Sequence, residues 1–264
     1  MIRARSISIR SAIVAASLAL SCGVLDIARA QEEEKTYTLS FKVPDGGTLT
    51  YHSQTTENVV DHTVSEPGAD GKQEPGSGKF ETEQTLVHEY RPFDEETIAI
   101  RTTIKNFQLT IDDKKIDHLP EGSDLWRKLS IKGYRKQLNK KATDFDKVDF
   151  VLPFEPVKIG EEWLYTAPPT DDLPVYLTTT YKIREVKKMD GKLVAVIDGI
   201  THADAIAPIQ DLRVKVSGDS RVIFAIEGGH VLQTNYQIEM LTRPQKNPAL
   251  KYIKQVKTSM ELVE

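Results

Sequence analysis

Alternation with a period of two is the feature that most constrains how this chain can fold. Apolar and polar residues take alternate positions from about residue 36 onward, with frequent Thr, Val, Ile and Tyr and short polar turns between the runs. Such a pattern is typical of β-strands that bury one face and expose the other. We therefore predict a mainly β protein with antiparallel, curved sheet or sheets, arranged as a β-sandwich or a half-barrel.

Short polar segments separate the predicted strands. Residues 112–115 (DDKK) and Asp190-Gly191 stand between alternating runs, and Asp-Gly is the strongest short signal for a hairpin. Residues 227–229 (EGG) predict a further hairpin turn. Residues 217–220 (SGDS) are interpreted in the same way, as a turn between two strands.

Two segments carry helical signals. Ser123 could cap a short helix with Leu125, Trp126 and Leu129 on one face. Near the C-terminus, helical spacing after residue 248 competes with strand alternation over 256–262, and we favour a last strand there. The prediction thus includes one or two short helices beside the sheets.

The segment 65–79 (SEPGADGKQEPGSGK) interrupts the alternation. It contains four Gly and two Pro, and one Ala is its only apolar residue. A segment of this composition buries too little apolar surface to offset the entropy lost on ordering. We predict a flexible surface loop, for which partner binding is a possible role.

A weak internal duplication divides the chain. Residues 47–51 and 160–165 each place an aromatic residue four or five positions after a Gly that follows a Pro-containing turn. A long strand, an acidic turn and a short strand follow in both places. We predict a first β-rich unit over 31–150 and a second over 151–264. One continuous sheet built from both is an alternative, and chance similarity between two β meanders is another.

Two short turn motifs open these halves, 153–163 (PFEPVKIGEEW) and 46–51 (GGTLTY). They resemble those of a group of secreted or lipid-anchored bacterial β proteins of unknown function. The resemblance covers most of the chain after the leader and implies a β fold. It implies no catalytic residues, because the motifs mark turns and the group has no established activity.

The first thirty residues have the anatomy of an export signal. Residues 1–10 carry three Arg and no acid, residues 12–25 carry no charge, and Ala28 and Ala30 supply a small-x-small cleavage pattern. The charge-free run is shorter than the ~20 residues of a membrane span. We expect cleavage before Gln31 and an exported protein, periplasmic or secreted.

The single cysteine, Cys22, lies inside this leader. After cleavage at Ala30 the chain would hold no disulfide, no thiolate nucleophile and no Cys-type metal site. Residues 19–22 (ALSC) also loosely resemble a lipobox, at which Cys22 would be lipidated and the protein anchored to a membrane. Cleavage after Ala30 is the favoured interpretation and lipidation is the alternative.

Charge narrows the range of partners. The leader holds four of the 35 basic residues and one of the 39 acidic ones, which leaves 31 against 38 and a net charge near −7. An acidic chain argues against nucleic acid as a partner, because phosphates favour a basic face. No other apolar run approaches spanning length, so we expect no transmembrane span after leader removal.

One basic stretch stands out in this acidic chain. Seven Lys and Arg residues without an acid among them are candidates for an anionic-partner patch: Arg127, Lys128, Lys132, Arg135, Lys136, Lys140 and Lys141. A lipid headgroup or a cell-wall polymer could dock on such a patch. A solvated face is the ordinary explanation and stays the default.

No motif for catalysis or metal binding stands out. The six His residues form no His-Glu-x-x-His pair, and His202-x-Asp204 lacks a third ligand. Asp144, Asp146 and Asp149 lack the Gly and the distal Glu of a calcium loop. We expect no catalytic residue, cofactor or metal, although paired carboxylates for sugar cleavage leave little trace in a sequence.

The favoured function is that of an exported, non-enzymatic cell-envelope protein with a binding or scaffolding role. Its partner would be an envelope polymer, a lipid or another envelope protein. A carrier that holds an apolar ligand in a curved sheet is the first alternative. A hydrolase of envelope carbohydrate, with two carboxylates in a cleft flanked by Trp or Tyr, is the second.

Overall fold

The computed structural model describes residues 35–67, 73–116, 124–136, 150–169, 173–207, 211–247 and 249–263. Tyr37–Glu264 form one compact unit, which holds nearly all of these residues. The mainly β prediction is confirmed, because the described residues form fourteen strands and no helix. None of them therefore belongs to a helix that could cross a membrane.

The main sheet contains twelve strands, each antiparallel to its neighbours. Its order is β7-β6-β4-β3-β2-β14-β13-β12-β11-β10-β9, and β5 pairs with β4. The end strands β7 and β9 are not paired with each other in the described chain, so the sheet is not closed. Its strands are β2 (Thr48–Pro67), β3 (Gln73–Asp94), β4 (Thr97–Ile111), β5 (Lys114–Ile116), β6 (Asp124–Ser130), β7 (Arg135–Lys136), β9 (Glu162–Ala167), β10 (Leu177–Met189), β11 (Lys192–Ala207), β12 (Leu212–Ala225), β13 (His230–Pro244) and β14 (Tyr252–Leu262). The two-residue strands β1 (Thr36–Tyr37) and β8 (Val157–Lys158) belong to a separate small sheet.

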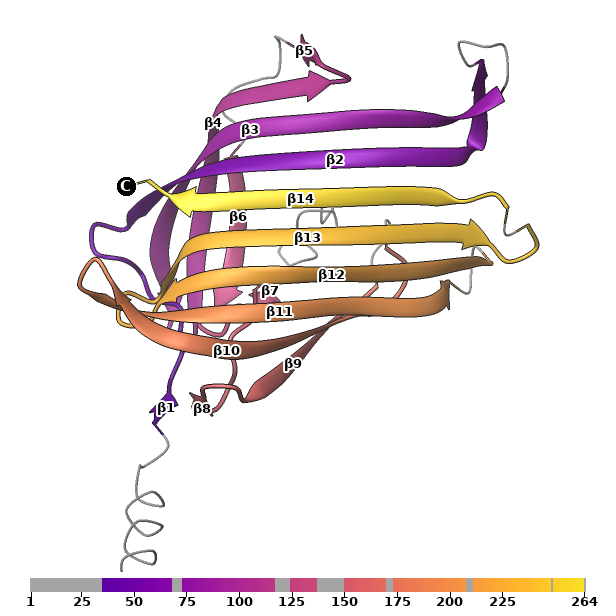
Figure 1. Cartoon of the computed structure of the whole chain (residues 1–264). Coiled ribbons are helices and arrows are strands. Elements are labelled where there is room, and N and C mark those ends of the chain that lie inside the picture. Colours follow the sequence, from indigo (N-terminus) through magenta and orange to yellow (C-terminus); the bar gives the residue numbers. More distant parts are fainter. Residues whose placement is uncertain are drawn as a thin grey trace, which may run out of the picture. The chain divides into compact units, whose positions relative to one another are not determined.

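One pairing joins early and late parts of the chain. β14 lies between β2 and β13, as the yellow strand in Figure 1 shows. Residues 252–262 of β14 pair in order with residues 61–51 of β2. Strands from 31–150 and from 151–264 thus form one continuous sheet. The duplication of the two halves stays a prediction.

One face of this sheet, called here the inner face, is buried and apolar. In β12, Val214, Val222 and Phe224 are buried, whereas Arg213 and Arg221 point to the opposite, outer face and are exposed. This alternation is the one that the sequence predicts, and it places apolar side chains out of water on one side only. The main core on the inner face consists of Leu39, Phe41, Ile98, Ile100, Leu129, Leu152, Val157, Tyr181, Ile183, Ala195, Ile197, Val222 and Phe224.

Two irregular segments, 38–44 and 150–156, cover part of the inner face. Phe41 N–H donates to the Ile131 carbonyl at 2.7 Å, and Leu152 N–H donates to the Lys132 carbonyl at 2.8 Å. Gly133 (φ 92°) lies in the turn that receives both segments, and a Cβ there would lie 2.5 Å from the Phe150 carbonyl oxygen. A residue without a side chain is needed at 133, because the second covering segment passes directly against it.

The predicted hairpin turns at 190–191 and 227–229 are confirmed, and the turn predicted at 112–115 is shorter than expected, because Lys114 and Lys115 belong to β5. Asp112, Asp113, Asp190 and Gly191 have φ values of 46°, 63°, 49° and 77°. Two successive residues with positive φ are the signature of the two-residue turn whose twist matches the strands it joins. The last strand favoured over 256–262 is confirmed too, as part of β14.

The turn predicted at 217–220 is wrong. Ser217–Ser220 continue β12 and pair with β11 on one side and β13 on the other. A Cβ on Gly218 would lie 2.5 Å from the Gln237 carbonyl oxygen, so this Gly permits close packing within the sheet rather than a turn. Ser, Gly and Asp favour turns locally, but two neighbouring strands satisfy the backbone of this segment instead.

The loop predicted at 65–79 is shorter than expected. β2 extends to Pro67 and β3 begins at Gln73, and Gly76, Ser77 and Gly78 pair with residues 61–59. As at 217–220, backbone pairing overrides the local preference, because cross-strand hydrogen bonds extend the β2–β3 hairpin into a segment of weak strand propensity. Several predicted sites lie outside the described residues: Cys22, Ala28, Ala30, Gln31, Lys140, Lys141, Asp144, Asp146 and Asp149.

Phe224→Ala tests the buried inner face. Phe224 is fully buried, and its ring meets that of Phe41 edge-on at 5.4 Å between centroids. We expect the free energy of unfolding, measured by chemical denaturation, to fall by about 3–5 kcal/mol. Tyr176→Ala is the matched control, since Tyr176 is 65% exposed, and it should change stability by about 0.5 kcal/mol or less. Equal losses in the two variants would contradict the assignment of the core.

Candidate functional site

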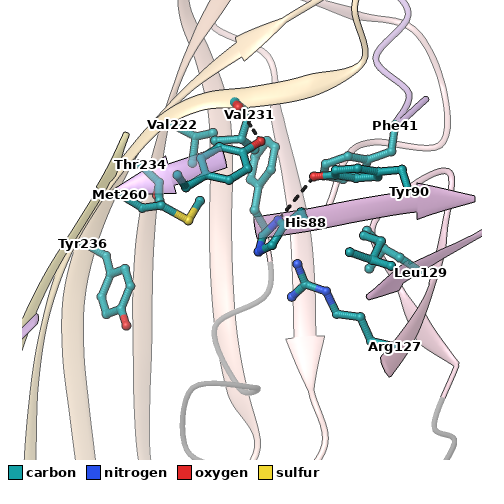
Figure 2. A pocket seen from close by; sticks show the side chains of 13 residues that line it. Phe41, His88, Tyr90, Arg127, Leu129, Val222, Val231, Thr234, Tyr236 and Met260 are labelled. Atoms are coloured by element: carbon teal, nitrogen blue, oxygen red, sulfur yellow. Dashed lines mark hydrogen bonds between the residues drawn. The ribbon is translucent and has the colours of Figure 1, made fainter. Parts of the chain in front are cut away.

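A cavity of about 160 Å³ lies on the inner face, where the sheet meets the two covering segments (Figure 2). Its walls come from β2, β3, β4, β6, β12, β13 and β14, so they combine distant parts of the chain. Most of its lining side chains are aromatic or aliphatic. The lining consists of Phe41, Tyr51, His88, Tyr90, Ile100, Arg127, Leu129, Phe150, Val222, Val231, Thr234, Tyr236 and Met260.

Rings in edge or tilted contact form much of the wall. The Phe41 and Phe150 rings meet at 6.2 Å between centroids with an interplanar angle of 76°. His88 lies 5.0 Å from the Tyr51 ring and 6.1 Å from the Tyr90 ring. Such contacts hold large side chains in defined positions, so this wall is preorganised rather than collapsed.

His88 is neutral at ordinary pH. It is 5% exposed, and burial, with a further contribution from the nearby Arg127 charge, lowers its pKa from 6.5 to about 3. Its Nδ1 lies 3.4 Å from the Tyr90 hydroxyl (Figure 2). A neutral imidazole has one N–H donor and one acceptor nitrogen, so it adds polarity to the cavity without adding charge.

The tyrosine hydroxyls keep their protons. Burial raises the pKa of Tyr51, Tyr90 and Tyr236, and Tyr90 adds to the shift of Tyr51. The Tyr51 hydroxyl of β2 donates to the Val231 carbonyl of β13 at 3.0 Å, which links the two strands that flank β14. Because these phenols are neutral, they supply no negative charge to the site.

Among the described residues that line the cavity, Arg127 is the only one with a charged side chain. It lies in β6 opposite Ile100 of β4, between Leu125 and Leu129 on the same face. Its Nε is buried and has no hydrogen-bond partner among the described residues. Figure 2 shows the guanidinium directed toward His88. A permanent cation thus borders an otherwise apolar and neutral cavity.

Sequence analysis named Arg127 only as a member of the basic stretch, because it left open a short helix after Ser123, and the structure has no helix there. The segment is β6, in which Leu125, Arg127 and Leu129 alternate with Trp126 and Lys128. Leu125 and Leu129 are four residues apart, a spacing that suits one face of a helix and one face of a strand equally. Read as a strand, the alternation of Leu125, Arg127 and Leu129 would have predicted that Arg127 shares a face with the two leucines.

The basic stretch does not gather into one patch where its side chains are described. Arg127 borders the cavity, and Lys128 lies on the outer face with its Nζ 3.4 Å from the Phe93 ring centroid. Lys132 Nζ donates to the Leu39 carbonyl at 2.8 Å, and burial lowers the pKa of this lysine. Arg135 and Lys136 form β7. The anionic-partner patch stays a prediction for the remaining members.

The described residues contain no cluster of three or more potential metal ligands. Asp204 instead accepts two hydrogen bonds from Arg213, at 2.8 and 2.9 Å, and His202 is exposed. A second depression, of about 230 Å³, lies beside this pair and is lined by Asp204, Arg213, Lys215, Leu241 and Arg243. It lies on the outer face of the sheet, and four of its five lining side chains are charged, unlike those of the inner cavity.

No family model and no curated protein matches this chain. Among solved structures, one described as "Lipid-protein interactions in lipovitellin" is similar in fold, with a TM-score of 0.45 and 9% sequence identity. The match covers 83% of this chain, which spans only 25% of the lipovitellin chain. A similarity of this size defines neither a family nor a function for the chain. The structure itself defines the class, a mainly β protein with an open antiparallel sheet and an apolar cavity on its inner face.

His88→Gln tests the buried neutral imidazole. Above about pH 6.5, His88 is neutral in the folded and unfolded states and contributes no pH dependence. Between about pH 6.5 and 3 the unfolded state binds the proton more readily, so His88 makes stability fall as pH decreases, by up to about 1.4 kcal/mol per unit. In chemical denaturation, His88→Gln should lose this part of the slope, whereas a variant of the exposed His202, His202→Gln, should keep it. Equal slopes in both variants would contradict the burial of His88.

Proposed function

We propose that this protein is a non-enzymatic binding protein that holds a ligand with an apolar body in the inner-face cavity. The single observation that carries the proposal is the cavity itself, a preformed space walled by aromatic and aliphatic side chains. Ligand sites are typically concave and mostly apolar, with a few polar groups that fix orientation. Here those polar groups are Arg127, His88 and the tyrosine hydroxyls.

The size of the cavity limits its occupant. An apolar cavity of about 150 Å³ holds one benzene molecule and stays dry when empty. A space of about 160 Å³ therefore suits a ring or a chain of about six carbons. A longer ligand would have to extend beyond the cavity along the inner face, past Tyr236 and Met260.

The hydrolase alternative receives no support from this site. It requires two carboxylates near a bound sugar, and none of the thirteen described lining residues is Asp or Glu. The outer-face depression holds one carboxylate, Asp204, which is already paired with Arg213.

We further propose that the protein acts outside the cytoplasm. The export pattern of the first thirty residues supports this, with cleavage before Gln31 or lipidation at Cys22 as the two routes. An envelope lipid or another small apolar metabolite of the envelope would then be the natural class of ligand.

Thr234→Trp tests the proposal by filling the cavity. Thr234 lines the cavity from β13, and Asn235 is its exposed neighbour on the outer face, so Asn235→Trp is the matched control. We expect 1-hexanol, a neutral probe, to bind the natural protein in ligand-detected NMR titrations. Binding should weaken by about tenfold or more in Thr234→Trp, since the space is occupied, and stay within about twofold in Asn235→Trp. Absence of binding to the natural protein, or equal binding to all three, would contradict the proposal.

A further inference from the structure

We propose that the cavity selects a carboxylate on a chain of about six carbons, or the carboxylate end of a longer acyl chain, and that Arg127 binds this carboxylate. The inference rests on the proposed function, because it names the ligand class of the same cavity. Its basis is a charge at the cavity wall that the described part of the protein does not neutralise.

The described surroundings of Arg127 favour an anion. No described carboxylate lies within ion-pair distance of its guanidinium, and its buried Nε has no partner in the described chain. A buried donor without a partner costs about 1–3 kcal/mol, and a charge bordering a low-dielectric space costs more. A ligand that brings one negative charge and an acceptor oxygen would remove both costs.

Arg101 of β4 also has a buried Nε, but its Nη1 lies 3.6 Å from a Glu89 carboxylate oxygen. On the outer face, Arg213 and Arg221 have carboxylate partners at 2.8 and 2.9 Å. Elsewhere along β2 and β14, the half-buried Lys254 pairs with Glu57 at 2.9 Å. Arg127 thus differs from these four cations in having a buried Nε and no ion pair with a described carboxylate.

The chemistry of the site favours a carboxylate over other anions. A guanidinium is a planar fork of donors that fits the two oxygens of a carboxylate. Neutral His88 and the Tyr90 hydroxyl add further polar atoms at the same end without a second positive charge. One cation beside an apolar space matches a singly charged head better than a phosphate with two charges, whose desolvation would cost more.

The positions of the lining residues give the ligand a direction. Figure 2 shows Arg127 and His88 at one side of the cavity and Met260 and Tyr236 at the other. The carboxylate would lie at the first side, and the chain would run between the aromatic rings toward Met260. This arrangement separates the polar end of an amphipathic acid from its apolar body.

The first test compares three ligands of equal chain length on the natural protein: hexanoate, 1-hexanol and hexylammonium. We expect hexanoate to bind at least about tenfold more tightly than 1-hexanol, as a charge-assisted hydrogen bond would provide, and hexylammonium to bind most weakly. Isothermal titration calorimetry or competition NMR at neutral pH measures the three affinities. If hexanoate bound no more tightly than 1-hexanol, an acid of the chain itself would already neutralise Arg127, and the inference would be overturned.

The second test uses Arg127→Gln, with Lys128→Gln as the matched control. Both variants remove one positive charge from β6, but Lys128 lies on the outer face. Arg127→Gln should lose the preference for hexanoate while 1-hexanol still binds within about threefold, and Lys128→Gln should keep the preference. Retained preference in Arg127→Gln would contradict the inference.

The outcomes separate this inference from the proposed function. Tight binding of 1-hexanol without a preference for hexanoate would support the proposed apolar ligand site and contradict the proposal that Arg127 binds a carboxylate. Failure of all three ligands to bind the natural protein would contradict both proposals. If thermal unfolding shows that Arg127→Gln does not fold, the relative affinities of the three ligands for the natural protein still test whether the cavity prefers a carboxylate.

Discussion

The pairing of β14 with β2 is the interaction on which the rest of the structure depends. It joins residues 252–262 to residues 61–51, so the strands of the early and late chain become one sheet. The Thr55 and Thr258 hydroxyls meet across this joint at 2.9 Å on the inner face. Without it, Tyr51 and Met260, which line the same cavity, would belong to separate pieces of the protein.

One-sided burial follows from that continuous sheet. Arginines and acids pair on the outer face, whereas the inner face collects the large apolar side chains and is partly covered by segments 38–44 and 150–156. The covering segments bring Phe41 and Phe150 over the sheet, and the space left beneath them is the cavity. The sheet thus produces a binding surface through the same alternation that stabilises it.

The site differs from the rest of the core in how its polar groups are placed. His88 and Tyr90 contact each other, and Tyr51 is bound to the Val231 carbonyl, so these groups are stable inside an apolar wall. Arg127 lacks such a partner in the described chain. A protein that only needed a stable core would gain by an apolar residue at this position, which is why we assign Arg127 to ligand binding.

Much of the fold could be predicted from period-two alternation and turn residues, because both are local. The Asp190-Gly191 hairpin, the turn at 227–229 and the last strand were identified in this way. Residues 217–220 and 65–79 were not, since hydrogen bonds to the neighbouring strands satisfy their backbone and override a local preference for turns.

The cavity could not be predicted from the sequence, because its walls combine residues as far apart as Phe41 and Met260. The position of Arg127 in the cavity lining could not be predicted for a different reason. Spacing of four between Leu125 and Leu129 fits a helix and a strand alike, so Arg127 was grouped with its basic neighbours and not with its apolar ones.

The most direct measurement of the central claim uses protein labelled with ¹³C at its methionine methyl groups. Met260 lines the inner cavity, whereas Met189 ends β10 at the 190–191 hairpin and lies outside the lining. On addition of hexanoate, the account predicts a saturable shift of the Met260 methyl signal and no shift of the Met189 signal. An unchanged Met260 signal at saturating ligand would contradict a ligand-binding inner face.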